Sequence, residues 1–195
     1  MIIEMLPEKD VALYALMIDE WNHDLSPWEA PAVFGKEAFG DGAGKTLRFI
    51  QKNLFPIIQS RRAGEQNIKY YLGGYSLAGL FALWAGYQTQ QFKGIAAASP
   101  SVWFPRWIEF IQEQKIKSPL VYLSLGDKEE KVKNPVMAKV GENIRSMERI
   151  LQKSEQCREC VLEWNPGNYF KDIEKRMAKA FAWVIQRNGK ELSHK

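Results

Sequence analysis

The sequence predicts an α/β fold in which a mostly parallel sheet carries helices on both faces. Two observations predict it. Short apolar runs with the length of buried strands recur along the chain, and segments with the apolar period of amphipathic helices separate them. Residues 120–125 are a clear buried strand, and residues 173–186 form an amphipathic helix that closes the chain. Strands that alternate with helices favour parallel pairing.

Length and composition favour one domain, spanning residues 1–195. A chain of 195 residues that is 46% hydrophobic can bury one good core. Charged residues make up 26%, both signs are interspersed and the net charge is +4, so we expect no nucleic-acid partner. No apolar run approaches the length of a membrane span, and residues 1–9 lack the features of a signal peptide. With only two cysteines, we expect a cytoplasmic protein.

The chain begins with an apolar run and a polar loop. Residues 11–18 are almost continuously apolar, and we interpret them as a strand buried on both faces. Residues 19–28 then form a loop, in which Pro27 and Pro31 exclude a regular element. Loops at the carboxyl ends of parallel strands form the ligand crevice. The aromatic and imidazole side chains of this loop therefore line the crevice or pack beside it: Trp21, His23 and Trp28.

The glycine-rich residues 39–46 invite comparison with a phosphate-binding loop, but the spacing is wrong. A Walker A motif needs glycine five residues before Gly44, where this chain has Phe39, and no strand precedes the stretch. We interpret it as a flexible loop before an amphipathic helix that Pro56 ends or kinks. The predicted buried stripe of that helix is Leu47, Ile50, Leu54, Ile57 and Ile58.

Beyond residue 69, strands and helices are predicted in alternation. The strands are expected at 70–72, 94–98, 120–125 and 160–164, and the helices at 77–88, 107–114, 136–153 and 173–186.

Residues 69–84 carry the motif on which the functional interpretation of the chain depends. An apolar strand turns through Gly74-Tyr-Ser76-Leu-Ala78 into a helix. A sharp strand–turn–helix bend with a central serine is the nucleophile-elbow arrangement. Gly74 and Ala78 supply the small residues that such a turn needs on either side of the serine. The N–H of Leu77, at the helix N-terminus, is then placed to stabilise an oxyanion.

Four motifs in fixed order resemble one known family. They are the elbow at 74–84, the loop at 98–104, the turn at 123–129 and the segment Trp-Asn-Pro-Gly-Asn at 164–168. Together they resemble the "Putative esterase" family of α/β-hydrolases, which is similar to enterochelin esterases, feruloyl esterases and S-formylglutathione hydrolases. The resemblance implies an α/β-hydrolase fold and hydrolysis of a small-molecule ester. It implies a serine, a histidine and an acidic residue at the active site, with neither metal nor cofactor.

The family's site residues map onto this sequence incompletely. Ser76 matches the nucleophile, and Leu77 matches one oxyanion donor. The acid follows the strand at 120–125 and is either Glu129, which we favour, or Asp127. We also expect Trp21 and Trp103 to contact the substrate. The family's base position holds Tyr169, and the histidines of the chain lie elsewhere, at His23 and His194.

Two hypotheses follow from these departures. Tyrosine, with an ordinary pKa near 10, is about 0.1% ionised at pH 7 and is no substitute for imidazole. The chain is therefore a slow serine esterase, with His23 as a conceivable replacement base, or a catalytically impaired relative that binds or assembles. The sheet also looks N-terminally truncated, which would remove the second oxyanion donor. A sheet edge exposed in this way favours a homodimer.

The pair Cys157 and Cys160 has the spacing of redox or zinc motifs. No second pair accompanies it, and we interpret it as structural.

Overall fold

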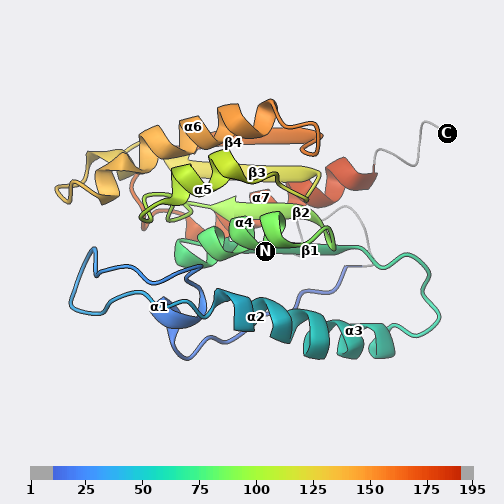
Figure 1. Ribbon diagram of the computed structural model, residues 1–195. Coiled ribbons are helices and arrows are strands. Elements are labelled where there is room, and N and C mark those ends of the chain that lie inside the picture. Colours follow the sequence, from blue (N-terminus) through green and yellow to red (C-terminus); the bar gives the residue numbers. More distant parts are fainter. Residues whose placement is uncertain (1–10, 190–195) are drawn as a thin grey trace.

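The computed structural model describes residues 11–189 and shows a sheet of four parallel strands (Figure 1). Their order is that of the sequence, β1-β2-β3-β4. The strands are β1 (Tyr70–Tyr75), β2 (Phe92–Ala98), β3 (Leu120–Gly126) and β4 (Glu159–Asn165). Because all neighbouring strands pair in parallel, their carboxyl ends lie at one edge of the sheet. The loops that carry the predicted site residues leave from that edge.

Helices cover both faces of the sheet, which confirms the predicted fold class. On one face, α4 (Leu77–Gln88) packs on β1 and β2, and α6 (Val140–Gln152) packs on β3 and β4. α5 (Trp107–Glu113) packs against α6. On the other face, α7 (Ile173–Gly189) crosses β1, β2 and β3 (Figure 1). Within residues 11–189, none of the helices has the length and apolar composition that crossing a bilayer requires.

Successive residues of the middle strands enter two different cores. Ile95, Val121 and Leu123 belong to the larger core under α4, α5 and α6. Ala96 and Tyr122, between them in sequence, face α7 in a smaller core. Side chains along a strand alternate between the two faces of a sheet, so β2 and β3 are buried on both sides. This is why they are continuously apolar in the sequence.

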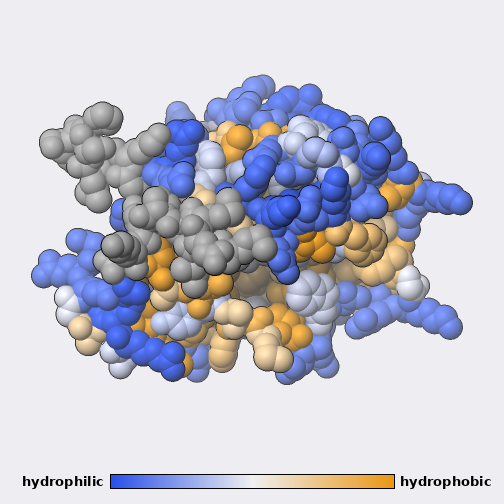
Figure 2. Space-filling model, turned by 180° about the vertical axis from the view of Figure 1, so that it is seen from behind, coloured by the Kyte–Doolittle hydropathy of each residue, from blue (hydrophilic) through white to orange (hydrophobic). Residues whose placement is uncertain are grey.

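Residues 11–18 do not form the predicted strand. They make no ladder with any described strand, and their exposure alternates. Tyr14, Leu16 and Ile18 are half-buried against the larger core, whereas Leu13 is 48% exposed and Met17 is 93% exposed. The prediction of burial on both faces is therefore wrong as well, because only some of the side chains pack on the core. An apolar run does not specify a hydrogen-bonded partner strand. Seen from behind, apolar residues are exposed across the middle of the molecule between hydrophilic ones (Figure 2).

The loop at 19–28, predicted to be irregular, begins with one helical turn, α1 (Trp21–Asp24). Three segments then follow without a break: α2 (Ala43–Phe49), the π-helical turn η2 (Ile50–Leu54) and α3 (Phe55–Arg61). A π turn contains an extra residue, so it rotates everything after it around the helix axis. Phe55, which was not in the predicted stripe, is consequently buried, while Ile57, predicted to be buried, is 48% exposed. Ile58 is buried, as predicted. Pro56 lies in the first turn of α3, where its missing N–H is tolerated.

Two short 3₁₀ segments complete the described elements: η3 (Glu129–Lys131) and η4 (Met137–Lys139), which lie between β3 and α6.

Candidate active site

Ser76 lies between the last residue of β1 and the first residue of α4, with φ of 60° and ψ of −125°. A positive φ is strained for serine, and such strain is found where a turn is held from several sides. Here the N–H of Ser76 donates to the carbonyl oxygen of Ala98 at 3.3 Å. Its own carbonyl accepts the N–H groups of Leu80 at 3.0 Å and Ser101 at 3.1 Å. The strand, turn and helix that the sequence predicts are present.

The turn is tight enough to require its small residues. A Cβ added to Gly74 would lie 2.5 Å from the backbone carbon and 2.6 Å from the Cβ of Ala78. A Cβ added to Gly79 would lie 3.0 Å from the carbonyl oxygen of Gly74. The spacing of small residues around Ser76 is thus a packing requirement of the bend.

The hydroxyl of Ser76 has another hydroxyl beside it: its Oγ lies 3.3 Å from Oγ of Ser101. Serine is not a base, so this contact does not activate the nucleophile. Leu77 is the first residue of a 12-residue helix. Its N–H is one of the four at a helix N-terminus that have no partner within the helix, which suits an oxyanion donor.

His23 is occupied with acidic neighbours. Its Nδ1 lies 3.0 Å from Asp24 and 3.8 Å from Glu20, and its Nε2 lies 3.7 Å from Asp41. The hydrogen bond with Asp24 raises the pKa of His23 above its ordinary value. Within the described part of the chain, none of its recorded contacts reaches Ser76. His194 lies outside the described residues.

The same imidazole fastens α1 to the glycine-rich loop. A Cβ added to Gly42 would lie 2.7 Å from Nδ1 of His23, and Gly42 donates its N–H to the carbonyl oxygen of His23 at 2.9 Å. Gly42 is therefore required because the loop packs closely against His23. Glu20, His23 and Asp24 are also the group of metal-ligating type found among residues 11–189.

Glu129 is the better placed of the two predicted acids. It is 6% exposed, and its Oε1 accepts three hydrogen bonds. The donors are the N–H of Gly126 at 2.7 Å, Oγ of Ser99 at 2.7 Å and Nη1 of Arg176 at 2.8 Å. Its Oε2 accepts none of the hydrogen bonds recorded among the described residues, and it is not among the fully buried atoms without a partner. One carboxylate oxygen is thus fixed, and the other is open.

Asp127 is exposed and has a different task. Its Oδ1 accepts the N–H of Gly167 at 2.8 Å, and its own N–H donates to the carbonyl oxygen of Asn165 at 2.9 Å. Asp127 therefore holds the backbone of the loop that follows β4.

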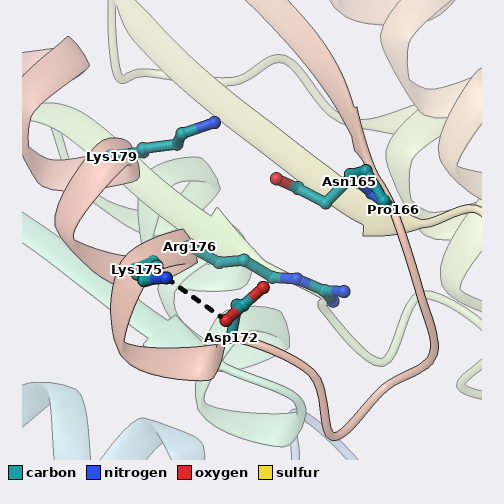
Figure 3. A pocket seen from close by; sticks show the side chains of 6 residues that line it. All are labelled: Asn165, Pro166, Asp172, Lys175, Arg176 and Lys179. Carbon is teal, nitrogen blue, oxygen red and sulfur yellow. Dashed lines mark ion pairs between the residues drawn. The ribbon is translucent and has the colours of Figure 1, made fainter.

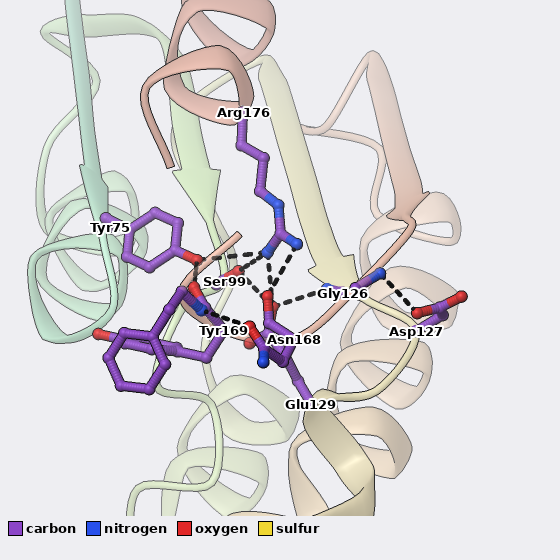
Figure 4. Close-up of polar contacts among 10 residues, drawn as sticks. Tyr75, Ser99, Gly126, Asp127, Glu129, Asn168, Tyr169 and Arg176 are labelled. Carbon is purple, nitrogen blue, oxygen red and sulfur yellow. Dashed lines mark hydrogen bonds and ion pairs between the residues drawn. The ribbon is translucent and has the colours of Figure 1, made fainter. Parts of the chain in front are cut away.

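Arg176 is a residue of this site that sequence reasoning missed. It lies on α7 and is 1% exposed. Its Nη1 donates to Tyr75 OH at 3.3 Å, Ser99 Oγ at 3.1 Å and Glu129 Oε1 at 2.8 Å, and its Nη2 donates to the carbonyl oxygen of Asn168 at 3.0 Å (Figure 4). The sequence did contain a sign that Arg176 is buried. Arg176 is four and eight residues before the buried Ala180 and Val184, so a charge lies on the apolar face of the helix.

Tyr169, at the family's base position, lies in the loop after β4 and is half-buried. Tyr75 OH donates to the carbonyl oxygen of Tyr169, and the two rings meet edge to face with centroids 5.1 Å apart. Burial raises the pKa of Tyr75, so its phenol remains a donor at neutral pH. The loop is thus held through its backbone, and the phenol of Tyr169 makes no recorded hydrogen bond within residues 11–189.

The predicted aromatic residues have different surroundings. Trp103 is 8% exposed and packs with Phe34, the ring centroids lying 6.0 Å apart. Trp21 is 45% exposed on α1. Substrate contact by either residue remains a prediction. Trp28 packs beside the crevice loops, because its Nε1 donates to the carbonyl oxygen of Pro105 at 2.9 Å.

A small pocket of about 130 Å³ lies between the start of α7 and the end of β4, and Ser76 is not among its lining residues (Figure 3). Its lining is Asn165, Pro166, Asp172, Lys175, Arg176 and Lys179. The pocket is therefore in contact with Arg176.

Cys157 is buried and Cys160 half-buried, and both are free thiols. Cys160 lies in the amino-terminal half of β4, at the end opposite the site.

A parallel sheet whose first strand bends into a helix through a serine with positive φ defines the α/β-hydrolase class. The chain belongs to the Esterase family, described as "Putative esterase", whose pattern matches residues 11–172. No curated protein is similar enough in sequence to count as a match.

Solved structures show the same fold. The siderophore hydrolase EstA from Aspergillus nidulans has 19% sequence identity and a TM-score of 0.68, over 89% of this chain and 70% of that one. An IroE-like serine hydrolase from Shewanella oneidensis has 19% identity and a TM-score of 0.68, over 83% and 55%. The enterobactin esterase FES from Shigella flexneri has 16% identity and a TM-score of 0.59, over 74% and 39%. The chain thus spans between about two fifths and seven tenths of these neighbours' lengths.

Proposed function

We propose that the protein is a carboxylic ester hydrolase that uses Ser76 as its nucleophile and turns over slowly. One observation carries the proposal: Ser76 is held at positive φ between β1 and α4, with the N-terminus of α4 directly beside it. Membership of the Esterase family and solved neighbours named as siderophore hydrolases and an enterobactin esterase support an ester as the substrate. A small-molecule or aryl ester suits the aromatic residues near the loops, including Trp103.

In this mechanism, Ser76 Oγ attacks the ester carbonyl carbon, the ester C–O bond breaks and the alcohol leaves with the proton that Ser76 loses. Water then hydrolyses the acyl-enzyme, which releases the carboxylic acid and restores the Ser76 hydroxyl. The N–H of Leu77 and the dipole of α4 stabilise the negative charge on the substrate oxygen. The Ser76 proton needs an acceptor, and a tyrosine phenol with an ordinary pKa near 10 is a poor one at pH 7. Losing the base of a serine hydrolase reduces turnover by about 10⁶. About 10³-fold over water remains from the oxyanion hole and binding.

Glu129 is the acid in this proposal. Its open Oε2 is the atom that would orient an imidazole at position 169, whereas Asp127 is bound to the loop backbone. The acid therefore survives in a site whose base has been replaced by a phenol.

A fluorophosphonate probe tests the nucleophile directly. We expect slow labelling of Ser76 in the native chain and faster labelling in Tyr169→His, located by mass spectrometry of the peptides. Ser76→Ala should abolish labelling, while Ser101→Ala, its hydroxyl neighbour, should retain it. Labelling at another residue, or a folded Tyr169→His variant that no probe modifies, would contradict the proposal.

The second candidate is a catalytically impaired relative that assembles, and the exposed apolar residues of 11–18 favour it. Met17 is 93% exposed, and β1 is the last strand on its side of the sheet in the described region. We propose a homodimer through this edge. Sedimentation should show a dimer that Met17→Asp dissociates, and a monomeric native protein would contradict the homodimer.

A cytoplasmic location and the absence of nucleic-acid partners stay predictions.

A further inference from the structure

We propose that Arg176 is a positioning residue of the Ser76 site: one buried guanidinium sets both the orientation of Glu129 and the place of residue 169. The inference rests on the proposed function, because it describes how the same site is assembled.

Arg176 donates hydrogen bonds at the carboxyl end of each of the four described strands. Its partners are Tyr75 at the end of β1, Ser99 after β2, Glu129 after β3 and Asn168 after β4 (Figure 4). Tyr75 immediately precedes Ser76, and Asn168 immediately precedes Tyr169. A side chain from α7, on the face away from α4, thus joins the nucleophile's turn to the loop at the base position.

These bonds depend on the shape of arginine. A guanidinium presents five donors in a fixed plane, whereas an ammonium is a compact charge on a flexible stem. Nη1 donates to Tyr75, Ser99 and Glu129, while Nη2 donates to the carbonyl oxygen of Asn168. The guanidinium and the carboxylate are also closely packed against the backbone of Gly126. A Cβ on Gly126 would lie 2.8 Å from Oε1 of Glu129 and 3.0 Å from Nη2 of Arg176. A lysine at 176 cannot make this set of contacts at once.

The consequence for Glu129 is a fixed direction. Because three donors converge on Oε1, rotation of the carboxylate would break all three bonds, and Oε2 remains the open atom. The consequence for residue 169 is a fixed backbone. Arg176 holds the carbonyl of Asn168, and Tyr75, itself a partner of Arg176, holds the carbonyl of Tyr169. Both halves of the proposed acid–base relay are therefore set by one group.

The test uses an imidazole as a reporter. In Tyr169→His, ¹⁵N NMR should show a single neutral tautomer that carries its proton on Nδ1, donated to Glu129, because a hydrogen-bond partner selects the tautomer. Adding Arg176→Lys to this variant should give a mixture of tautomers. Fluorophosphonate labelling of Ser76 should also slow by about 100-fold, the effect expected of a displacement near 1 Å.

The chain offers a matched control. Arg145 binds Glu130 through both terminal nitrogens, at 2.9 Å and 3.0 Å, but this pair is exposed and lies outside the site. Arg145→Lys in the Tyr169→His background should leave the tautomer and the labelling rate unchanged.

The outcomes separate the inference from the proposed function. A single tautomer that Arg176→Lys disrupts, without any reaction at Ser76, would support the positioning role and reject the esterase. A single tautomer and an unchanged labelling rate after Arg176→Lys would overturn the positioning role.

If Arg176→Lys does not fold, Arg176→Gln combined with Glu129→Gln removes both buried charges and serves as the second variant. In the Tyr169→His background we expect this variant to give a mixture of tautomers, because no guanidinium fixes the side chain at 129. A retained single tautomer would overturn the positioning role. Guanidinium ion added to Arg176→Ala should restore the single tautomer, since the neighbouring pocket of about 130 Å³ gives it access. Failure of that rescue in a folded variant would also count against the role.

Discussion

The turns after β1 and after β4 meet through Tyr75 and Tyr169, yet they are held in different ways. The turn at Ser76 is set by backbone contact: Gly74 is pressed against Ala78 without room for a Cβ. The loop at Tyr169 is set by side chains that bind its backbone, from Tyr75, Asp127 and Arg176. The first arrangement restricts residue types within the turn itself. The second leaves the residue at 169 free to change, so a phenol can replace an imidazole without releasing the loop.

The largest expected effect is on the network that holds the second loop. Glu129→Ala should reduce the free energy of unfolding by about 3–5 kcal/mol, because it leaves the charge of Arg176 buried and unpaired. Urea denaturation measures it. Glu130→Ala, next in sequence but in an exposed pair with Arg145, should cost at most about 1 kcal/mol. Equal losses in the two variants would mean that the Glu129–Arg176 pair does not hold the loop.

The next effect tests the steric side of the comparison. Gly74→Ala should cost about 1–3 kcal/mol, because the added Cβ must displace the backbone of α4. Gly44→Ala is the control: its Cβ would meet only Arg48 Nη1, at 3.6 Å. In a helix that change should be neutral or should stabilise by up to about 1 kcal/mol. A stable Gly74→Ala with unchanged labelling of Ser76 would show that the turn is not steric in origin.

A smaller effect separates the two tyrosines. Tyr75→Phe removes the donor to the Tyr169 carbonyl and should cost about 1–2 kcal/mol. Tyr169→Phe removes a hydroxyl without a recorded partner and should change stability by less than about 0.5 kcal/mol. Thermal or urea unfolding of both variants measures the difference. The reverse order would show that the loop is held by the phenol of Tyr169.

The smallest effect concerns His23, which belongs to neither turn. Its pKa is raised in the folded state, chiefly by the hydrogen bond with Asp24, so its protonated form stabilises the fold. That contribution is fully present below the unfolded pKa of about 6.5 and is lost as pH rises through the higher folded pKa. The stability difference between the native chain and His23→Gln should therefore be largest below about pH 6.5 and shrink as the pH rises through the higher folded-state pKa. Parallel pH profiles would contradict it.

The same contrast explains what the sequence could predict. The elbow was predictable because backbone sterics leave few residue types at 74, 78 and 79. The strand at 120–125 was predictable because both of its faces are buried. Residues 11–18 have a similar composition, but only alternate side chains pack on the core. Composition does not distinguish an extended segment of this kind from a strand.

Other features depend on contacts between distant residues. Arg176 bonds to groups up to 101 positions away, so its role emerges only once four loops are brought together. With the π turn at 50–54, Phe55 is buried in place of the predicted Ile57, because apolar periodicity assumes a regular helix. The sequence left both Glu129 and Asp127 open as the acid, because both follow β3 within three residues, and the choice of Glu129 stays a proposal.

Hydrolysis of a nitrophenyl ester by the native chain and by Tyr169→His is the most direct measurement of the central claim. The account predicts that kcat/KM rises by at least about 100-fold, a small part of what a base contributes in serine hydrolases. Tyr169→Phe should leave the rate unchanged, and adding Ser76→Ala should abolish the gain. A correctly folded Tyr169→His variant with no gain would contradict the claim that the missing base is what makes the site slow.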